Sequence, residues 1–200
     1  GRTTGGRDVT PGTWSFNWQD QGRLVEIHTP VNIVMYRTLV INAIPVKTEK
    51  TIKTLGDSVL ETETLTYETL PHPLNNVPGV KTVTTERGAS TFTTTYTYSA
   101  DTSHWSNYGQ PIQIVETGDL TRTTTMTYQH SFGKYIRGKV ASVTTTVGGQ
   151  ASVRSFTYDG VTGFMTASTD LGVTTTYTPN AAGNAESVWD ASGRRTDFTY

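Results

Sequence analysis

The sequence predicts an all-β fold built from tandem antiparallel β-hairpins. Threonine, valine, isoleucine, tyrosine and phenylalanine are abundant, and such β-branched and aromatic residues favour strands. Good helix-forming residues never cluster at 3.6-residue spacing over a useful length. A phrase of aromatic and glycine residues also returns along the chain, and such self-similarity is the signature of a repeat architecture. Because strand twist makes a long ribbon coil, we expect a coiled β-ribbon.

The returning phrase is clearest in the last third of the chain. Each unit has a tyrosine, a turn ending in glycine, a strand-like run, a second turn ending in glycine, and a threonine-rich run back to the next tyrosine. One such unit covers residues 158–177 and the next covers residues 177–200. The residues that mark these two short units are Tyr158, Asp159, Gly163, Tyr177, Gly183, Gly193 and Tyr200.

The same phrase is stretched upstream, where the tyrosines recur about every 30 residues, within the range of known repeat periods. The tyrosines and turn glycines of these longer units are Tyr67, Gly79, Tyr98, Gly109, Tyr128 and Gly138. We therefore predict divergent N-terminal hairpin repeats over 1–63, three long repeats over 64–157 and two short repeats over 158–200. Together they are expected to form one continuous array that is a fragment of a longer chain.

The N-terminal third begins with a predicted hairpin. Residues 13–18 place three aromatic side chains on one face of a strand, and residues 24–28 supply the partner strand across a turn at 20–23. The run 31–44 is the most apolar in the chain; its isoleucine, valine and threonine content and its flanking prolines favour a strand over a helix. Residues 46–55 and 59–67 alternate on either side of a turn at 56–58, so two long paired strands are expected.

Three longer loops occupy the same position in successive repeats, at 71–79, 101–109 and 129–138. They should therefore emerge along one edge of the stacked hairpins. The histidine and aromatic residues that we consider as ligand-contact candidates in these loops are His72, His104, Trp105, Tyr108, His130 and Tyr135. They could bind a metal or a glycan, or they could be ordinary polar and packing residues of hairpin ends. No histidine spacing typical of a zinc site supports the metal.

The short units resemble YD repeats, the tandem units of bacterial Rhs proteins, of the C components of Tc insecticidal toxins and of animal teneurins. The resemblance rests on Tyr158-Asp159 with Gly163, on Tyr177 with 182–184, and on 190–194 with 198–200. It extends over 64–157, whereas 30–63 matches poorly and only one unit has a literal Tyr-Asp pair. Near the start, Trp18 and Gly22 resemble a unit with tryptophan in the tyrosine position. The resemblance implies a ribbon that winds into a hollow shell.

Composition argues against several other classes of protein. The net charge is −1 without a basic patch, so no nucleic-acid partner is expected. There is no cysteine for a disulfide, and no apolar run approaches the ~20 residues that span a membrane. No nucleophile elbow or phosphate-binding glycine loop is evident, and we expect no cofactor. The aspartates Asp20, Asp159 and Asp190 lie in turn phrases, where side-chain capping of the turn explains them.

The function expected from these patterns is structural. By resemblance, the chain is a non-enzymatic segment of a large secreted or surface bacterial protein, building a β-shell that encloses or delivers a C-terminal effector. Rhs proteins also have an aspartate-dependent self-cleavage region, but no segment here matches it, so no catalytic residue is assigned. The alternative is a self-assembling extracellular filament or tube, or an adhesive element that binds surface glycans. Its exposed strand edges would then pair with other copies instead of with neighbouring repeats. A polysaccharide hydrolase would need a buried acidic pair, which the sequence does not indicate.

Overall fold

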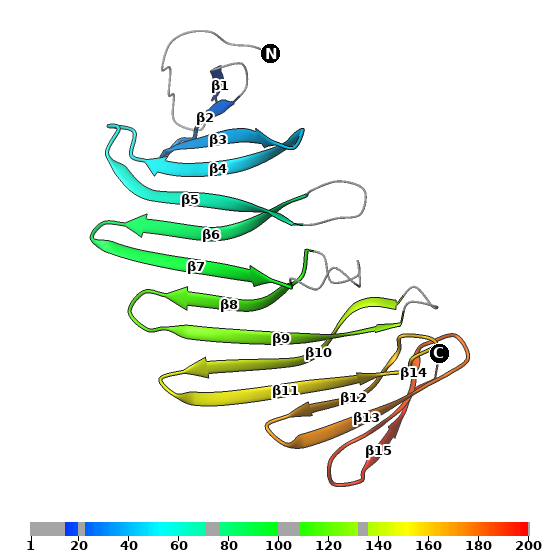
Figure 1. The fold of residues 1–200 in the computed structure, drawn as a ribbon. Coiled ribbons are helices and arrows are strands. Elements are labelled where there is room, and N and C mark those ends of the chain that lie inside the picture. The colour runs from blue at the N-terminus through cyan, green and yellow to red at the C-terminus, as the bar shows by residue number, and fades with distance from the viewer. Residues whose placement is uncertain (1–14, 20–22, 71–76, 100–108, 132–135, 200) are drawn as a thin grey trace. The chain divides into compact units, whose positions relative to one another are not determined.

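The computed structural model describes residues 15–19, 23–70, 77–99, 109–131 and 136–199 (Figure 1). All regular secondary structure in these ranges is β, in fifteen strands, which confirms the predicted all-β class. The chain divides into two compact units. The first comprises Gly1–Tyr96 with Glu116–Asp119, and the second comprises Thr97–Val115 with Leu120–Tyr200.

The first unit is a succession of antiparallel strands in chain order. Each of these strands pairs with the next one along the chain, as expected for tandem hairpins. The predicted first hairpin is confirmed as the β1–β2 pair. The strands are β1 (Ser15–Gln19), β2 (Leu24–His28), β3 (Ile33–Ile41), β4 (Ile44–Lys53), β5 (Val59–Leu70), β6 (Val77–Arg87) and β7 (Ser90–Tyr98), of which Thr97 and Tyr98 belong to the second unit.

The second unit continues the same pattern with shorter strands toward the C-terminus. From β9 onward, each strand again pairs antiparallel with its successor. The strands are β8 (Pro111–Thr117), β9 (Arg122–Ser131), β10 (Ile136–Val147), β11 (Gln150–Tyr158), β12 (Met165–Asp170), β13 (Val173–Pro179), β14 (Ala185–Trp189) and β15 (Arg195–Asp197), of which Glu116 and Thr117 in β8 belong to the first unit. Within the described residues, no helix is long and apolar enough to cross a membrane.

The apolar run 31–44 is not the single strand that the sequence predicted. A tight turn at Asn42 and Ala43, with φ of 50° and 64°, divides it into the end of β3 and the start of β4. Such left-handed two-residue turns suit hairpins because their twist matches that of the flanking strands. Pro45 lies inside β4, opposite Val40, instead of ending a strand. Proline is tolerated there because it is next to the strand end.

Two glycines that were predicted to end turns lie inside strands instead. Gly79 lies in β6 opposite Glu68, because that strand already begins at Val77. Gly138 lies in β10 with φ of 63°, at a shift in register between Ile136 and Lys139. A bulge of this kind favours a residue that tolerates a left-handed backbone, so Gly138 has a physical role in the strand.

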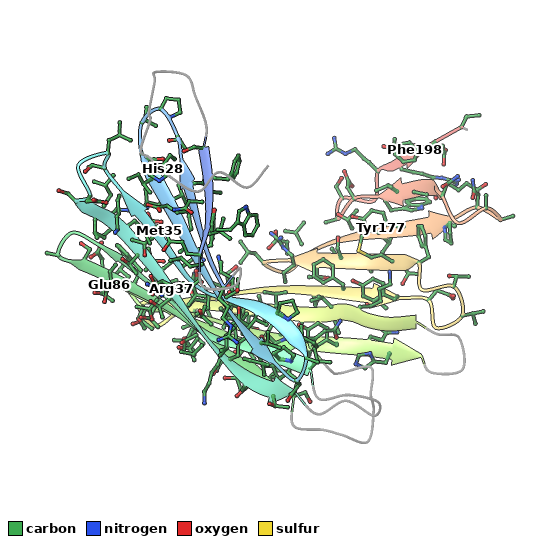
Figure 2. All side chains as sticks on the ribbon, turned by 90° about the horizontal axis from the view of Figure 1, so that it is seen from above. His28, Met35, Arg37, Glu86, Tyr177 and Phe198 are labelled. Atoms are coloured by element: carbon green, nitrogen blue, oxygen red, sulfur yellow. The ribbon has the colours of Figure 1, made fainter. Side chains whose placement is uncertain are left out.

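Little of either unit is fully buried. Among the described residues, the buried hydrophobic side chains are Ile33, which is 1% exposed, and Leu70, which is 7% exposed. Side chains stand out from both faces of the strands (Figure 2). The strands therefore hold together mainly through ladder hydrogen bonds and contacts between neighbouring side chains on one face.

The register of the second unit separates two kinds of face. One face carries an unbroken row of hydroxyl side chains across five strands. Its members are Thr127, Ser142, Ser155, Thr169 and Thr174. Neighbouring hydroxyls in this row bond to each other, at 2.6 Å between Thr127 and Ser142 and at 2.9 Å between Thr169 and Thr174. The residues one position away face the other side, so the row on that face is Met126, Val143, Arg154, Asp170 and Val173.

Candidate functional site

The aspartate of the Tyr-Asp phrase closes a short turn between β11 and β12. The Asp159 carboxylate Oδ1 accepts hydrogen bonds from the backbone N–H of Val161 at 3.0 Å and of Thr162 at 2.6 Å. It also accepts one from the Thr162 hydroxyl at 2.8 Å. The N–H of Gly163 donates to the Asp159 carbonyl at 2.9 Å, and the N–H of Asp159 donates to the Phe164 carbonyl at 2.8 Å. The prediction that Asp159 is a turn-capping residue is thus confirmed.

The same device closes the turns at 180–184 and 190–194. Asn180 Oδ1 accepts from two backbone N–H groups of its turn, each at 3.0 Å. Asp190 Oδ1 accepts from the N–H groups of Ser192 and Arg194, each at 2.9 Å, which confirms its predicted turn role. Gly183 and Gly193, with φ of 83° and 81°, supply the left-handed residue of each turn. Asp20 lies outside the described residues.

Hydrogen bonding lowers the pKa of both aspartates. The backbone N–H of Thr162 is the main cause of the lowered pKa of Asp159. The Ser192 hydroxyl, followed by the N–H of Arg194, lowers the pKa of Asp190. A catalytic acid needs the opposite shift, since it must hold its proton near neutral pH. These carboxylates instead remain charged acceptors that fix the turns.

The repeat tyrosines reach back to the preceding strand. The hydroxyl of Tyr67 on β5 donates to the Lys47 carbonyl on β4, and that of Tyr128 on β9 donates to the Pro111 carbonyl on β8 at 2.7 Å. Tyr177 on β13 bonds through its hydroxyl to Ser168 on β12 at 3.1 Å. Burial raises the pKa of Tyr67 and of Tyr128, so these phenols stay protonated donors.

Two glutamates of β5, Glu61 and Glu63, lie in ion pairs. The Glu63 carboxylate is 2.5 Å from Lys47 Nζ, and Glu61 is paired with Arg87 and lies 4.0 Å from Lys50 Nζ. Each carboxylate is thereby matched with a cation. In the part of the chain that the structure describes, no group of three or more histidine, cysteine, aspartate or glutamate residues could hold a metal ion.

A cavity of about 470 Å³ in the second unit brings together polar and aromatic side chains. It lies over β8 and β9 and extends to the end of β7. The residues that line it are Thr97, Ser99, Gln110, Ile112, Gln113, Thr125, Met126, Thr127, Tyr128 and His130. Of these, only Tyr128 and His130 were singled out from the sequence. Alternation in 110–116 indicated a strand there, but it gave no sign that Gln113 would line a cavity.

His130 was predicted to lie in a loop, and this placement is wrong. It lies in β9, where its ring stacks on that of Tyr128 with centroids 6.5 Å apart and an interplanar angle of 21°. Its Nδ1 accepts the N–H of Gly138 at 3.1 Å. The strand continues to this point because it pairs with the start of β10, which the sequence had assigned to the loop.

The remaining predicted residues fall on turns, on strands or outside the described ranges. Trp18 lies in β1 and is 58% exposed, Tyr98 ends β7, and Gly109 precedes β8 with φ of 78°. Tyr158 ends β11 beside its turn, and burial raises its pKa. The residues that lie outside the described ranges are Gly22, His72, His104, Trp105, Tyr108, Tyr135 and Tyr200.

Comparison with models of known protein families gives no match, and comparison with curated protein sequences gives none either. Among solved structures, the chain is similar to one in the crystal structure of TcdB2-TccC3-Cdc42, with a TM-score of 0.34 and 12% sequence identity. The alignment covers 91% of this chain and 11% of that chain. A functional interpretation therefore rests on the repeats and hairpins of this chain itself.

Proposed function

We propose that this chain is a non-catalytic wall segment of a β-shell, through which a large secreted or surface bacterial protein encloses or delivers an effector. One observation carries the proposal: the sequence repeat coincides with a repeated hairpin device. Asp159, Asn180 and Asp190 cap three turns by the same pattern of hydrogen bonds. Tyr67 and Tyr128 bond to the backbone of the preceding strand. A chain whose recurring residues close turns and join neighbouring strands is suited to building an extended wall.

The energetics of such a wall favour continuity. A single hairpin is marginal in water, and each added hairpin pairs the open edge of the one before it. Stability is then approximately a sum of unit terms and nearest-neighbour terms. Strand pairing of this kind continues from β9 to β15 in the second unit, with local shifts in register.

This wall would act by sequestering the enclosed effector. Asp159 and Asp190 act as turn caps, and Glu61 and Glu63 of β5 pair with cations, so these four carboxylates have structural partners. The hydroxyl row of β9–β13 adds a face without charge. A surface of small hydroxyl side chains stays hydrated and gives a non-native polypeptide few contacts to hold it.

Electron microscopy of the protein in its native preparation tests the proposal. Closed hollow particles are expected. Long tubes with an axial repeat would instead mean that edges join between copies, and would replace the shell with a structural filament. Open ribbons alone would contradict both assemblies.

Labelling of single cysteines gives a second, independent test, because the chain has no cysteine of its own. Val173 and Thr174 are both exposed and lie on opposite faces of β13. Val173→Cys and Thr174→Cys should both react with a bulky maleimide in the isolated chain. In the intact native protein, a closed wall should protect one of the two. Equal reaction of both in the native protein would refute enclosure.

A further inference from the structure

The hairpin of β3 and β4 ends in an apolar tip that the repeat device does not explain. It lies in the stretch that matches the repeat poorly, and we call residues 39–46 the β3–β4 tip. Its one polar side chain is the uncharged amide of Asn42, and the nearest charged residues along the chain are Arg37 and Lys47. Its three residue pairs are Leu39–Val46, Val40–Pro45 and Ile41–Ile44.

The neighbouring strands bond to this hairpin up to the same level on both of its edges. On the outer edge of β3, the backbone N–H of Thr38 donates to the Arg23 carbonyl at 2.8 Å. On the outer edge of β4, the Lys47 carbonyl accepts a hydrogen bond from the Tyr67 hydroxyl. Thr38 and Lys47 lie directly opposite each other in the hairpin. The β3–β4 tip therefore extends beyond the ladders that join β3 to β2 and β4 to β5.

Large apolar side chains of the tip are exposed on both of its faces. Leu39 is 50% exposed and Val40 is 59% exposed. Successive residues of a strand point to opposite faces, so these two side chains lie on opposite sides of the hairpin. Isolated exposed apolar residues are ordinary, whereas a contiguous uncharged group is typical of an interaction site. A flat protein surface would cover one face of this tip, but a fluid apolar medium surrounds both.

The outer edge of the tip is poorly suited to adding another protein strand. The pair that closes a two-residue hairpin exchanges hydrogen bonds, so the backbone N of the next residue points outward. Here that residue is Pro45, which has no N–H to donate. Proline on an edge strand also hinders edge-to-edge pairing between copies. The tip is therefore suited to contact through its side chains.

The length and charge of the tip match the interface of a lipid bilayer. A strand rises about 3.4 Å per residue, so three residue pairs reach roughly 10 Å beyond the level of Thr38 and Lys47. Interfacial segments bury their apolar side chains about 5–10 Å into the boundary between headgroups and acyl chains. At the base of the tip, Arg37 pairs with Glu49 and Lys47 pairs with Glu63. These cations are thus already matched, which leaves little attraction to anionic lipids.

The exposed side chains and the paired base together indicate the partner of this hairpin. We propose that the β3–β4 tip is a membrane-docking element that inserts shallowly into the surface of a zwitterionic lipid bilayer. Leu39, Val40 and Ile44 supply the apolar contact, while the ion pairs stay at the level of the headgroups. Deeper insertion is excluded, because the edges of a hairpin carry backbone polar groups that hydrocarbon cannot satisfy. The proposal does not rest on the shell, because the hairpin lies wholly within the first unit.

Fluorescence from one labelled cysteine tests the insertion, because the chain has no cysteine of its own. Val40→Cys, labelled with the environment-sensitive dye NBD in the 200-residue chain, is titrated with phosphatidylcholine vesicles. Its emission should rise severalfold and shift to shorter wavelength, and nitroxides near the headgroup end of the acyl chains should quench it. Leu171→Cys is the matched control, since this residue is 71% exposed in the turn between β12 and β13. No response at position 40, or an equal response at position 171, would overturn the proposal.

Two further outcomes would assign the tip to a different partner. A rise in emission with protein concentration alone, without vesicles, would overturn the proposal and assign the tip to contact between copies of the chain. Binding only to vesicles that contain phosphatidylserine, with loss at high salt, would overturn it too and assign the binding to charge. We expect the same partitioning with and without phosphatidylserine, and little change with salt.

Vesicle flotation of unlabelled variants locates the contact. Leu39→Ser combined with Val40→Ser should lower partitioning into phosphatidylcholine vesicles at least about tenfold, because the inserted apolar area is lost. Leu171→Ser combined with Val173→Ser is the matched control, since both residues are exposed at another hairpin turn, and it should float as the original chain does. Ile44→Ser, on the second strand of the tip, is an additional variant that should also weaken binding. Equal flotation of the two double variants would refute the assignment.

Discussion

Gly79 is a position where a single added carbon should cost measurable stability. An ideal Cβ there would lie 2.6 Å from Leu70 Cδ1, 2.7 Å from Cγ and 3.0 Å from Cδ2. Non-bonded carbons prefer about 3.5–4.0 Å, so the new atom would overlap three atoms of one side chain. Leu70 is 7% exposed and has little room to turn away. We expect Gly79→Ala to lower the free energy of unfolding of the β5–β6 pair by about 1–3 kcal/mol, the usual cost of overpacking.

The partner residue makes this prediction sharper. Leu70→Ala alone should cost about 2–5 kcal/mol, because it leaves a cavity. It also removes the Cγ and both Cδ atoms that the Cβ added at position 79 would strike. In the Leu70→Ala background, Gly79→Ala should therefore cost nothing, or stabilise by about 0.4–1 kcal/mol, because alanine restricts the unfolded chain. Additive effects of the two substitutions would refute the reasoning, since contacting residues must couple.

Native-state hydrogen exchange of the β5 and β6 amides is the appropriate assay. An array of hairpins need not unfold at a single midpoint, whereas exchange reports each pair of strands by itself. Gly56→Ala is the matched control: its Cβ would meet Thr54 Oγ1 at 3.7 Å, an ordinary contact, and neither glycine has a left-handed backbone. The control should change stability by less than about 0.5 kcal/mol. A Gly79→Ala effect no larger than the control would contradict the packing argument.

Three further predictions concern the repeat device. Tyr128→Phe should destabilise the β8–β9 hairpin by about 0.5–1.5 kcal/mol, because a backbone carbonyl loses its donor. Amide hydrogen exchange measures this loss. Tyr177→Phe should cost less, because the Ser168 hydroxyl that it leaves can bond to water instead. Because the pKa of Asp190 is lowered on folding, its contribution is complete above the ordinary pKa of about 3.9 and is lost as pH falls through the lower folded pKa. NMR shifts of the carboxyl and amide groups should show the turn at 190–194 loosening in acid, while the turn at 180–184, which Asn180 caps, stays unchanged. Equal acid sensitivity of both turns would contradict the assignment. Gly193→Ala should cost about 1–2 kcal/mol through the left-handed backbone alone, since its Cβ would meet nothing within 4 Å; Gly193→Asn should cost less, and thermal unfolding of the two variants compares them.

The C-terminal turns could be predicted from the sequence because each is complete within a few residues. At 158–163 and 190–194, the aspartate, its N–H donors and the left-handed glycine all lie in one short segment. The turn at Asn42 and Ala43 could not be predicted in the same way. Alanine is an unusual left-handed residue, and the apolar residues on both sides continue without a break. Composition therefore identified the strands but did not locate this turn.

Roles that depend on residues across a strand pair were harder to predict. Gly79 was expected to end a turn, yet its lack of a side chain matters because of Leu70 on the neighbouring strand. Likewise, Thr97 and Gln113 gave no local signal, because they line a cavity only when residues 97–99 lie beside β8 and β9. Periodicity gives the face of a residue within one strand, but it does not give the identity of its neighbours on other strands.

The recurring residues define the hairpins without fixing what the faces present. The caps at Asp159 and Asp190 bond to backbone N–H groups, and the hydroxyl of Tyr128 bonds to a backbone carbonyl. Backbone partners are the same whatever the side chains, so these bonds survive changes on either face. A hydroxyl row can therefore cover one face of β9–β13, and its first member, Thr127, also lines the cavity over β8 and β9. If this reasoning holds, multiple substitutions along the hydroxyl row should leave the turns at 158–163 and 190–194 unchanged by NMR, whereas loss of a cap should open its own turn first.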